Sequence, residues 1–143
     1  MLQNITVIVL FGSMCTLQTG YAGGVTTHNV PLEVREKLAA GESQELIVVF
    51  DDTEVLVQAA QLNREKGIVF DDSATLRFKK ERYAKIKADV IAAQSPGKVE
   101  VLKDYDVLPL MLVRVRSAEA LQTLLSHPSV VRVHEDRKDN MFR

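Results

Sequence analysis

The fold of this chain is decided by the stretch PLMLVRVRSAEALQTLLSHPSVVRVHED, which extends from Pro109 to Asp136. The apolar run Leu110–Val115 predicts a strand, Val130–His134 predicts a second strand, and the leucines between them recur at helical spacing. Ser117 can accept a hydrogen bond from the free amides of the helix start, and the proline that follows His127 ends the helix. Two strands joined by a helical crossover of this length should run parallel in one sheet.

Two of the four expected strands are apolar on both faces. In Gln44–Phe50 and in Leu110–Val113, Leu, Ile, Val, Met or Phe side chains point to both sides of the strand. Strands of this kind are normally covered on both sides, which places them in the middle of a sheet.

The other two expected strands alternate more strongly between apolar and polar residues. In Lys98–Tyr105, valines at 99 and 101 oppose Glu100 and Lys103. In Val130–His134, Val131 and Val133 are expected to share one face, with the neighbouring residues on the other. This pattern is typical of strands nearer the edge of a sheet.

Helical periodicity occurs in three segments before the second strand. Pro31 can open a short helix, because its fixed φ suits the first helical position. Thr53 is expected to cap a helix that closes at Gly67, and Asp72 or Ser73 is expected to cap a longer one. The longer helix carries many Lys and Arg residues, which we interpret as a solvated face because no aromatic platform for nucleic-acid bases accompanies them.

The order of elements predicts an α+β, ferredoxin-like βαββαβ fold. We expect a four-stranded antiparallel sheet with two main helices on one face and an extra helix inserted after the first strand. Because two helices cover one face, the second face should present Val, Ile or Leu side chains, as a protein-binding site does. Three alternatives stay open for that face: cover by residues 53–67, cover by residues 31–40, or a homodimer.

The strand, the short helix with paired leucines and the ending HPSVVRVHED resemble the end of the propeptides of subtilisin-like serine proteases. The same domain also occurs as a free-standing inhibitor, in the subtilisin propeptide-like peptidase inhibitor family. The segment ELIVVFDD, Glu45 to Asp52, is similar to the first strand of that family. The resemblance covers Gln44 to Asp136, and the extra segment Thr53 to Asp72 departs from the family pattern, which has one helix there.

The resemblance implies how a protease would be bound. Domains of this family lay the open sheet face against two surface helices of the enzyme, and the segment after the fourth strand enters the catalytic cleft as a substrate would. Here the acidic pair Glu135 and Asp136 would offer carboxylates to the free amides of the protease helices. The inhibitory tail would consist of Asp139, Asn140, Met141, Phe142 and Arg143. Phe142 suits a subtilisin-type pocket and Arg143 a basic-residue-specific enzyme, and the pattern does not choose between them.

The start of the chain predicts export. The apolar run from Ile5 to Phe11 and the small residues Gly20 and Ala22 predict a signal peptide cleaved after Ala22, and hence a secreted or periplasmic protein without stable membrane insertion. Cys15 is the single cysteine, so the mature chain would contain none. We therefore expect a signal peptide at 1–22, a lead-in at 23–43, the inhibitor domain at 44–136 and the inhibitory tail at 137–143.

Composition and motifs narrow the function classes. Of the 143 residues, 18 are Lys or Arg and 19 are Asp or Glu, a balance that provides no electrostatic basis for a nucleic-acid partner. His28, His127 and His134 lie outside any metal-ligand spacing, and no nucleophile or phosphate-loop motif occurs. We therefore expect no cofactor, no metal and no enzymatic activity.

The sequence predicts an inhibitor of a subtilisin-like serine protease, which could also assist folding of the enzyme as a chaperone does. One alternative is a ferredoxin-like oligomerisation or regulatory module without a protease partner. A second alternative is an orphaned zymogen fragment without a present function, which should fold poorly alone.

Overall fold

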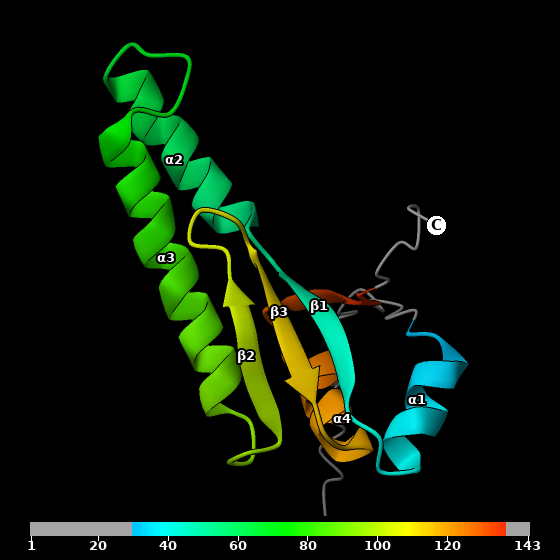
Figure 1. Ribbon diagram of the computed structural model, residues 1–143. Helices are drawn as coiled ribbons and strands as arrows, with labels where there is room; N and C mark the ends of the chain where they lie inside the picture. The colour runs from blue at the N-terminus through cyan, green and yellow to red at the C-terminus, as the bar shows by residue number, and fades with distance from the viewer. Residues whose placement is uncertain (1–29, 137–143) are drawn as a thin grey trace, which may run out of the picture.

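The computed structural model describes residues 30–136, in which four helices and four strands follow one another (Figure 1). The prediction for residues 1–22 and that for the tail, 137–143, lie outside this range. The elements are α1 (Leu32–Ala39), β1 (Gln44–Phe50), α2 (Thr53–Glu65), α3 (Ser73–Ala92), β2 (Val99–Asp104), β3 (Leu110–Val115), α4 (Ala118–Ser126) and β4 (Val130–Glu135).

The four strands form one antiparallel sheet in the order β2-β3-β1-β4. The two strands that are apolar on both faces, β1 and β3, occupy the middle, as the sequence predicts. Both β3 and β4 are antiparallel to β1, so they run parallel to each other on either side of it. The chain is therefore an α+β protein with a ferredoxin-like fold, which confirms the prediction.

The core lies between one face of the sheet and the helices. Alternate residues of β1 are buried there, and the same holds for β3. Helix α4 contributes the fully buried Leu124 and α3 contributes Val90. Helix α1, in the predicted lead-in, adds Val34 and Leu38 to the same core. The residues of the central strands that fill this core are Leu46, Val48, Phe50, Met111, Val113 and Val115.

Two helix starts illustrate how local chemistry sets the element boundaries. Ser117 caps α4 as predicted, with its Oγ accepting a hydrogen bond from the amide of Ala120 at 3.2 Å. The expectation that Thr53 caps α2 is wrong, because Thr53 is the first helical residue and its amide donates to the Asp51 carboxylate at 3.0 Å. An acidic side chain two residues upstream thus performs the role that the threonine hydroxyl was expected to perform.

The expected pairing of Val131 with Val133 on one face of β4 is also wrong. Val130 and Val133 are buried in the core, whereas Val131 is 38% exposed. The register between β1 and β4 shifts near Phe50, so that Val130 lies opposite Phe50 and Arg132 lies opposite Val49. This irregularity inserts one extra residue in the strand, which moves the core position from Val131 to Val130.

Helices α2 and α3 form a hairpin that projects beyond the sheet (Figure 1). We call this hairpin, residues 53–92, the arm. Near the end of α3 the buried Lys87 donates to the carboxylate of Asp104 and to the carbonyl of Tyr105, which ties the base of the arm to β2. The free end of the arm is the loop 66–72, and it lies far from the sheet (Figure 1).

Candidate protein-binding surface

The second face of the sheet presents an apolar centre. Because Leu46, Val48 and Phe50 point into the core, the intervening residues of β1 point the other way, and β3 repeats the pattern. The side chains that result are only partly buried. We call this surface the open sheet face and define it by Ile47, Val49, Leu110 and Leu112, which pair across the two central strands.

The two segments considered as covers for the open sheet face pack elsewhere. Helix α1 inserts Val34 and Leu38 into the core on the opposite side of the sheet. Helix α2 buries Val55 and Ala59 while packing against α3 in the arm. Within residues 30–136, neither segment therefore accounts for the apolar centre of the sheet.

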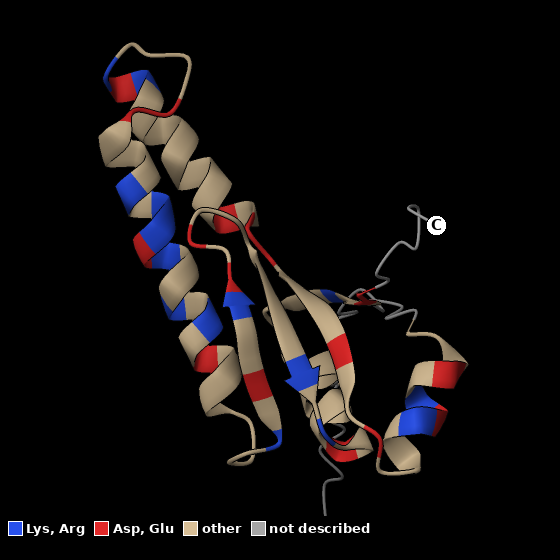
Figure 2. Cartoon of the chain, viewed as in Figure 1, with Lys and Arg blue, Asp and Glu red and all other residues tan. Residues whose placement is uncertain are grey.

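One end of the open sheet face is bounded by a row of ion pairs. Arg114 on β3 lies between Glu45 on β1 and Glu100 on β2, with Nη–Oε distances of 2.8 Å and 3.4 Å (Figure 2). The hydrogen bond with Glu45 and the negative charges on both sides raise the pKa of Arg114. Arg116 also pairs with Glu100. Half-exposed pairs of this kind stabilise little by themselves, but they hold a polar border beside the apolar centre.

Polar side chains border the centre along both edge strands. On β4, Arg132 lies opposite Val49 and His134 lies opposite Ile47. On β2, Lys103 lies opposite Leu112, and its Nζ stands 4.7 Å from the centroid of the Tyr105 ring. An apolar centre inside a polar rim is the usual anatomy of a protein–protein interface.

The acidic pair lies where β4 ends. Glu135 is the last residue of β4 and pairs with Leu46, so its row belongs to the helix-covered side of the sheet. Its charge also adds to the effect of Glu33, the main partner, in raising the pKa of Lys37. The amide of Asp136 donates to the carbonyl of Glu45 at 3.1 Å, which continues the strand pairing by one residue. The expected tail residues, Asp139, Asn140, Met141, Phe142 and Arg143, lie outside the described range.

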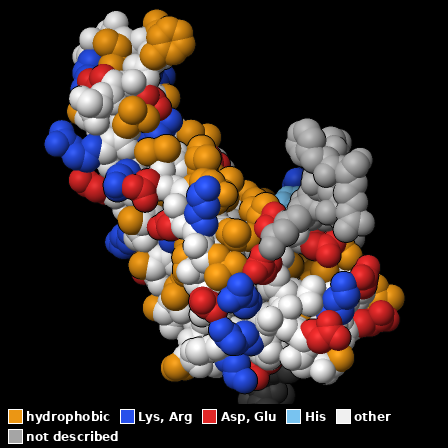
Figure 3. Space-filling view, viewed as in Figure 1, with side chains coloured by type: hydrophobic (Ala, Val, Ile, Leu, Met, Phe, Trp, Pro, Cys, Tyr) orange, Lys and Arg blue, Asp and Glu red, His pale blue; other side chains and the backbone are white. Residues whose placement is uncertain are grey.

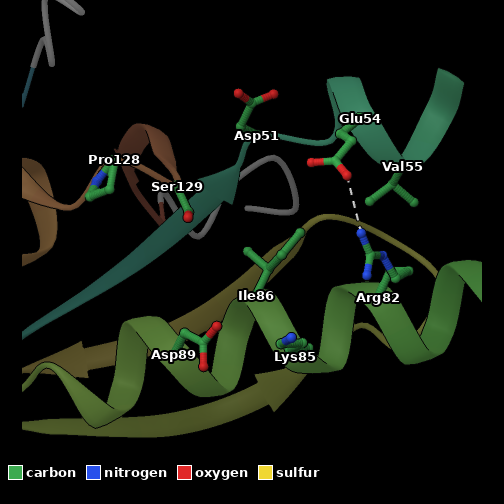
Figure 4. Close-up of a pocket in the computed structure, with 9 residues that line it drawn as sticks. All are labelled: Asp51, Glu54, Val55, Arg82, Lys85, Ile86, Asp89, Pro128 and Ser129. Atoms are coloured by element: carbon green, nitrogen blue, oxygen red, sulfur yellow. Dashed lines mark hydrogen bonds and ion pairs between the residues drawn. The ribbon is translucent and has the colours of Figure 1, made fainter. Parts of the chain in front are cut away.

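A hollow of about 290 Å³ with both polar and apolar walls lies where α2, α3, the end of β1 and the turn before β4 meet (Figure 4). Arg82 pairs with Glu54 across it at 3.2 Å. The pKa of Asp51 in its wall is lowered by the hydrogen bonds from Thr53. The lining includes charged side chains of both signs. The Arg82–Glu54 ion pair is not an arrangement of a nucleophile beside a general base.

The histidines in the described range have ordinary roles. His127 accepts a hydrogen bond from the amide of Ser129 at 3.2 Å, which stabilises the turn after α4. His134 is exposed on β4, and His28 lies outside the described range. Among residues 30–136, no three His, Cys, Asp or Glu side chains gather as metal ligands would.

Comparisons with protein-family models, with curated proteins and with solved structures found no match. No helix within residues 30–136 has both the length and the apolar composition needed to cross a membrane.

One surface feature was missed by the sequence reasoning. Val69 and Phe70, in the loop at the end of the arm, are 85% and 84% exposed. The available signal was the apolar run Ile68–Phe70, which stands between Gly67 and an acidic pair and therefore belongs to a turn and not to a helix face.

Proposed function

We propose that this protein is an inhibitor of a subtilisin-like serine protease, and that it docks on the enzyme with its open sheet face. The observation that carries the proposal is the apolar centre of that face, whose four side chains stay partly exposed and outside the hydrophobic core within residues 30–136. It is an apolar surface with a polar rim, suited to desolvation by a protein partner. The resemblance of residues 44–136 to subtilisin propeptides names the class of partner.

The sheet face alone is smaller than a stable interface. Specific complexes bury about 800 Å² on each partner, which is more than four half-buried side chains provide. The border of Arg114, Arg132 and Lys103 and the segment after β4 must therefore contribute. In this proposal Asp136 accepts hydrogen bonds from the free amides at the helix starts of the protease, where anions are favoured. Glu135 does not join it on the docking face, because its row belongs to the helix-covered side of the sheet.

The direction of β4 supports a substrate-like tail. Backbone pairing with β1 continues to Asp136, so the described chain is extended up to this residue. Asp139 follows three residues later, which corresponds to about 10 Å of extended chain. The residues from Asp139 to Arg143 would then add a strand to the edge of the catalytic cleft, and Met141, Phe142 or Arg143 would lie nearest the catalytic serine.

The test is a titration of residues 23–143 against a panel of subtilisin-type proteases, with a peptide substrate as the readout. Two variants separate the two contacts: deletion of residues 139–143, and the pair Ile47→Thr and Val49→Thr. Threonine keeps the β-branched shape, so the strand is retained while apolar contact is lost. Leu32→Thr on α1, whose side chain is 69% exposed, is the matched control.

We expect each variant to weaken inhibition at least tenfold, since truncating a central interface residue costs more than about 1 kcal/mol. The control should inhibit as the unmodified chain does. Failure of the unmodified chain to inhibit any protease of the panel would refute the proposal. If that chain were a dimer that the two threonine substitutions dissociate, the open sheet face would serve self-association.

A further inference from the structure

The end of the arm displays two large apolar side chains. Val69 and Phe70 are 85% and 84% exposed in the loop between α2 and α3. Burying an aromatic side chain such as phenylalanine removes 150–250 Å² from water. The display is therefore unfavourable for the isolated protein, which is typical of side chains that are buried in a complex.

The loop that carries them is held by a hydrogen-bond network. Asn63 in α2 accepts from the hydroxyl of Thr75 at 2.7 Å and donates to the carboxylate of Asp71 at 2.8 Å. Asp72 caps α3 through the amide of Thr75 and pairs with Lys66 at 2.9 Å. Thr75 is fully buried and Asn63 nearly so. The apolar tip is thus presented at a fixed place, which lowers the entropy lost on binding.

The tip is more than a pair of isolated side chains. Beside it, the exposed side of α2 and the first residues of the loop enclose a shallow hollow of about 440 Å³, with mainly apolar walls. Val57, Ala60, Ile68 and Val69 form those walls, together with Asn63 and Arg64. An exposed phenylalanine next to an apolar hollow can pack against a partner surface of complementary shape, with a pocket for the ring and a protrusion for the hollow.

The tip is too small to hold a partner by itself. Two side chains and one hollow remain well below the roughly 800 Å² per partner of a specific complex. Figure 3 shows hydrophobic side chains at the tip, along the arm and over the neighbouring part of the sheet, all on the face that carries the open sheet face. The two surfaces therefore suit one partner that touches both.

We propose that the arm is a second docking element, which contacts the same protease outside its catalytic cleft. This inference rests on the proposed function. Helix α2 has 13 residues, so its rise places the tip about 20 Å beyond the end of β1. Val69 and Phe70 would enter an apolar depression of the enzyme at that distance from the helices that the sheet contacts. The extra segment 53–72, which departs from the family pattern, thereby gains a role in choosing the protease.

The experiment uses the pair Val69→Ser and Phe70→Ser in the chain 23–143, with Leu32→Ser as the control. Affinity is measured for a protease that the unmodified chain inhibits, both active and with its catalytic serine blocked by a sulfonyl fluoride. The tip variant is also made without residues 139–143. A photoreactive phenylalanine analogue at position 70 reports contact directly.

We expect the tip variant to bind at least tenfold more weakly than the control, by the same factor with the tail present or deleted and with the serine free or blocked. Distant contacts add in this way. The analogue should crosslink to the enzyme. Unchanged affinity of the tip variant, with no crosslink, would overturn the inference and leave the proposed function standing. If the unmodified chain inhibits no protease, both fall together.

Discussion

Replacing Thr75 by valine removes one hydroxyl from the buried network that joins α2 to α3. Valine has nearly the shape of threonine, so the change leaves no cavity. It removes the donor to Asn63 Oδ1, which lies 2.7 Å from the hydroxyl, and Asn63 is only 8% exposed. An acceptor left without a partner at this depth costs about 1–3 kcal/mol. We expect about 2 kcal/mol, because Asn63 keeps its hydrogen bond to Asp71.

Urea denaturation measures this change. The midpoint should fall while the slope m stays constant, because the surface exposed on unfolding is the same. A loss of about 2 kcal/mol corresponds to a decrease in Tm of roughly 10 °C for a domain of this size. The network also holds the tip loop, so the variant should bind a protease more weakly even at temperatures where it is fully folded.

The Asn63→Ala background isolates the hydrogen bond from other effects of the substitution. In this background the Asn63 side-chain oxygen is absent, so no buried acceptor loses its partner when Thr75 is replaced. Thr75→Val should then lower the free energy of unfolding by less than about 0.5 kcal/mol. Equal costs in the two backgrounds would refute the reasoning, because the loss would then come from helix propensity or packing and not from the Asn63–Thr75 hydrogen bond.

Two further predictions concern charged groups. Asp104→Ala should destabilise the fold by roughly 2–3 kcal/mol, because it leaves the buried ammonium of Lys87 without its carboxylate partner. Lys87→Met should cost less, because the carboxylate that remains is accessible to water. Urea unfolding of both variants measures the two costs, and the reverse order would contradict the prediction. The amide of Thr75 and the ammonium of Lys66 lower the pKa of Asp72 from 3.8 to about 2, so its contribution to stability is present above pH 3.8 and is lost as the pH falls toward 2. Stability profiles between pH 5 and 2 should therefore be flatter for Asp72→Asn than for the unmodified chain, and parallel profiles would exclude this role.

Strand order could be predicted because it follows from burial. Strands β1 and β3 carry apolar residues on both sides, and a central position gives each of these residues neighbouring strands on its left and right. The start of α4 could also be predicted, because Ser117 caps an amide only three residues further along the chain. The open sheet face could be inferred because the two main helices cover one face of the sheet and leave the other without a helix.

The wrong predictions concern positions whose geometry depends on another part of the fold and not on the local sequence. Nothing within Val130–His134 shows that the register with β1 shifts at Phe50, and that shift exchanges the positions of Val130 and Val131. The hydrogen bond from the Thr53 amide to Asp51 at the start of α2 depends on how the chain turns out of β1, which the local pattern does not contain. In both places a tertiary or backbone constraint replaced the local preference.

The sequence by itself determined the class of fold, the central strands and the apolar character of the surface that we propose for docking, because each depends on periodicity along one segment. Only the tertiary structure decided that α1 packs into the core, that α2 and the first part of α3 project beyond the sheet while the last part of α3 joins the core, and that Val69 and Phe70 stand exposed at the tip. These outcomes depend on which surfaces meet across long sequence separations. A pattern of apolar residues indicates that a face is to be buried. Which element packs on that face depends on tertiary packing and on hydrogen bonds such as that between Asn63 and Thr75.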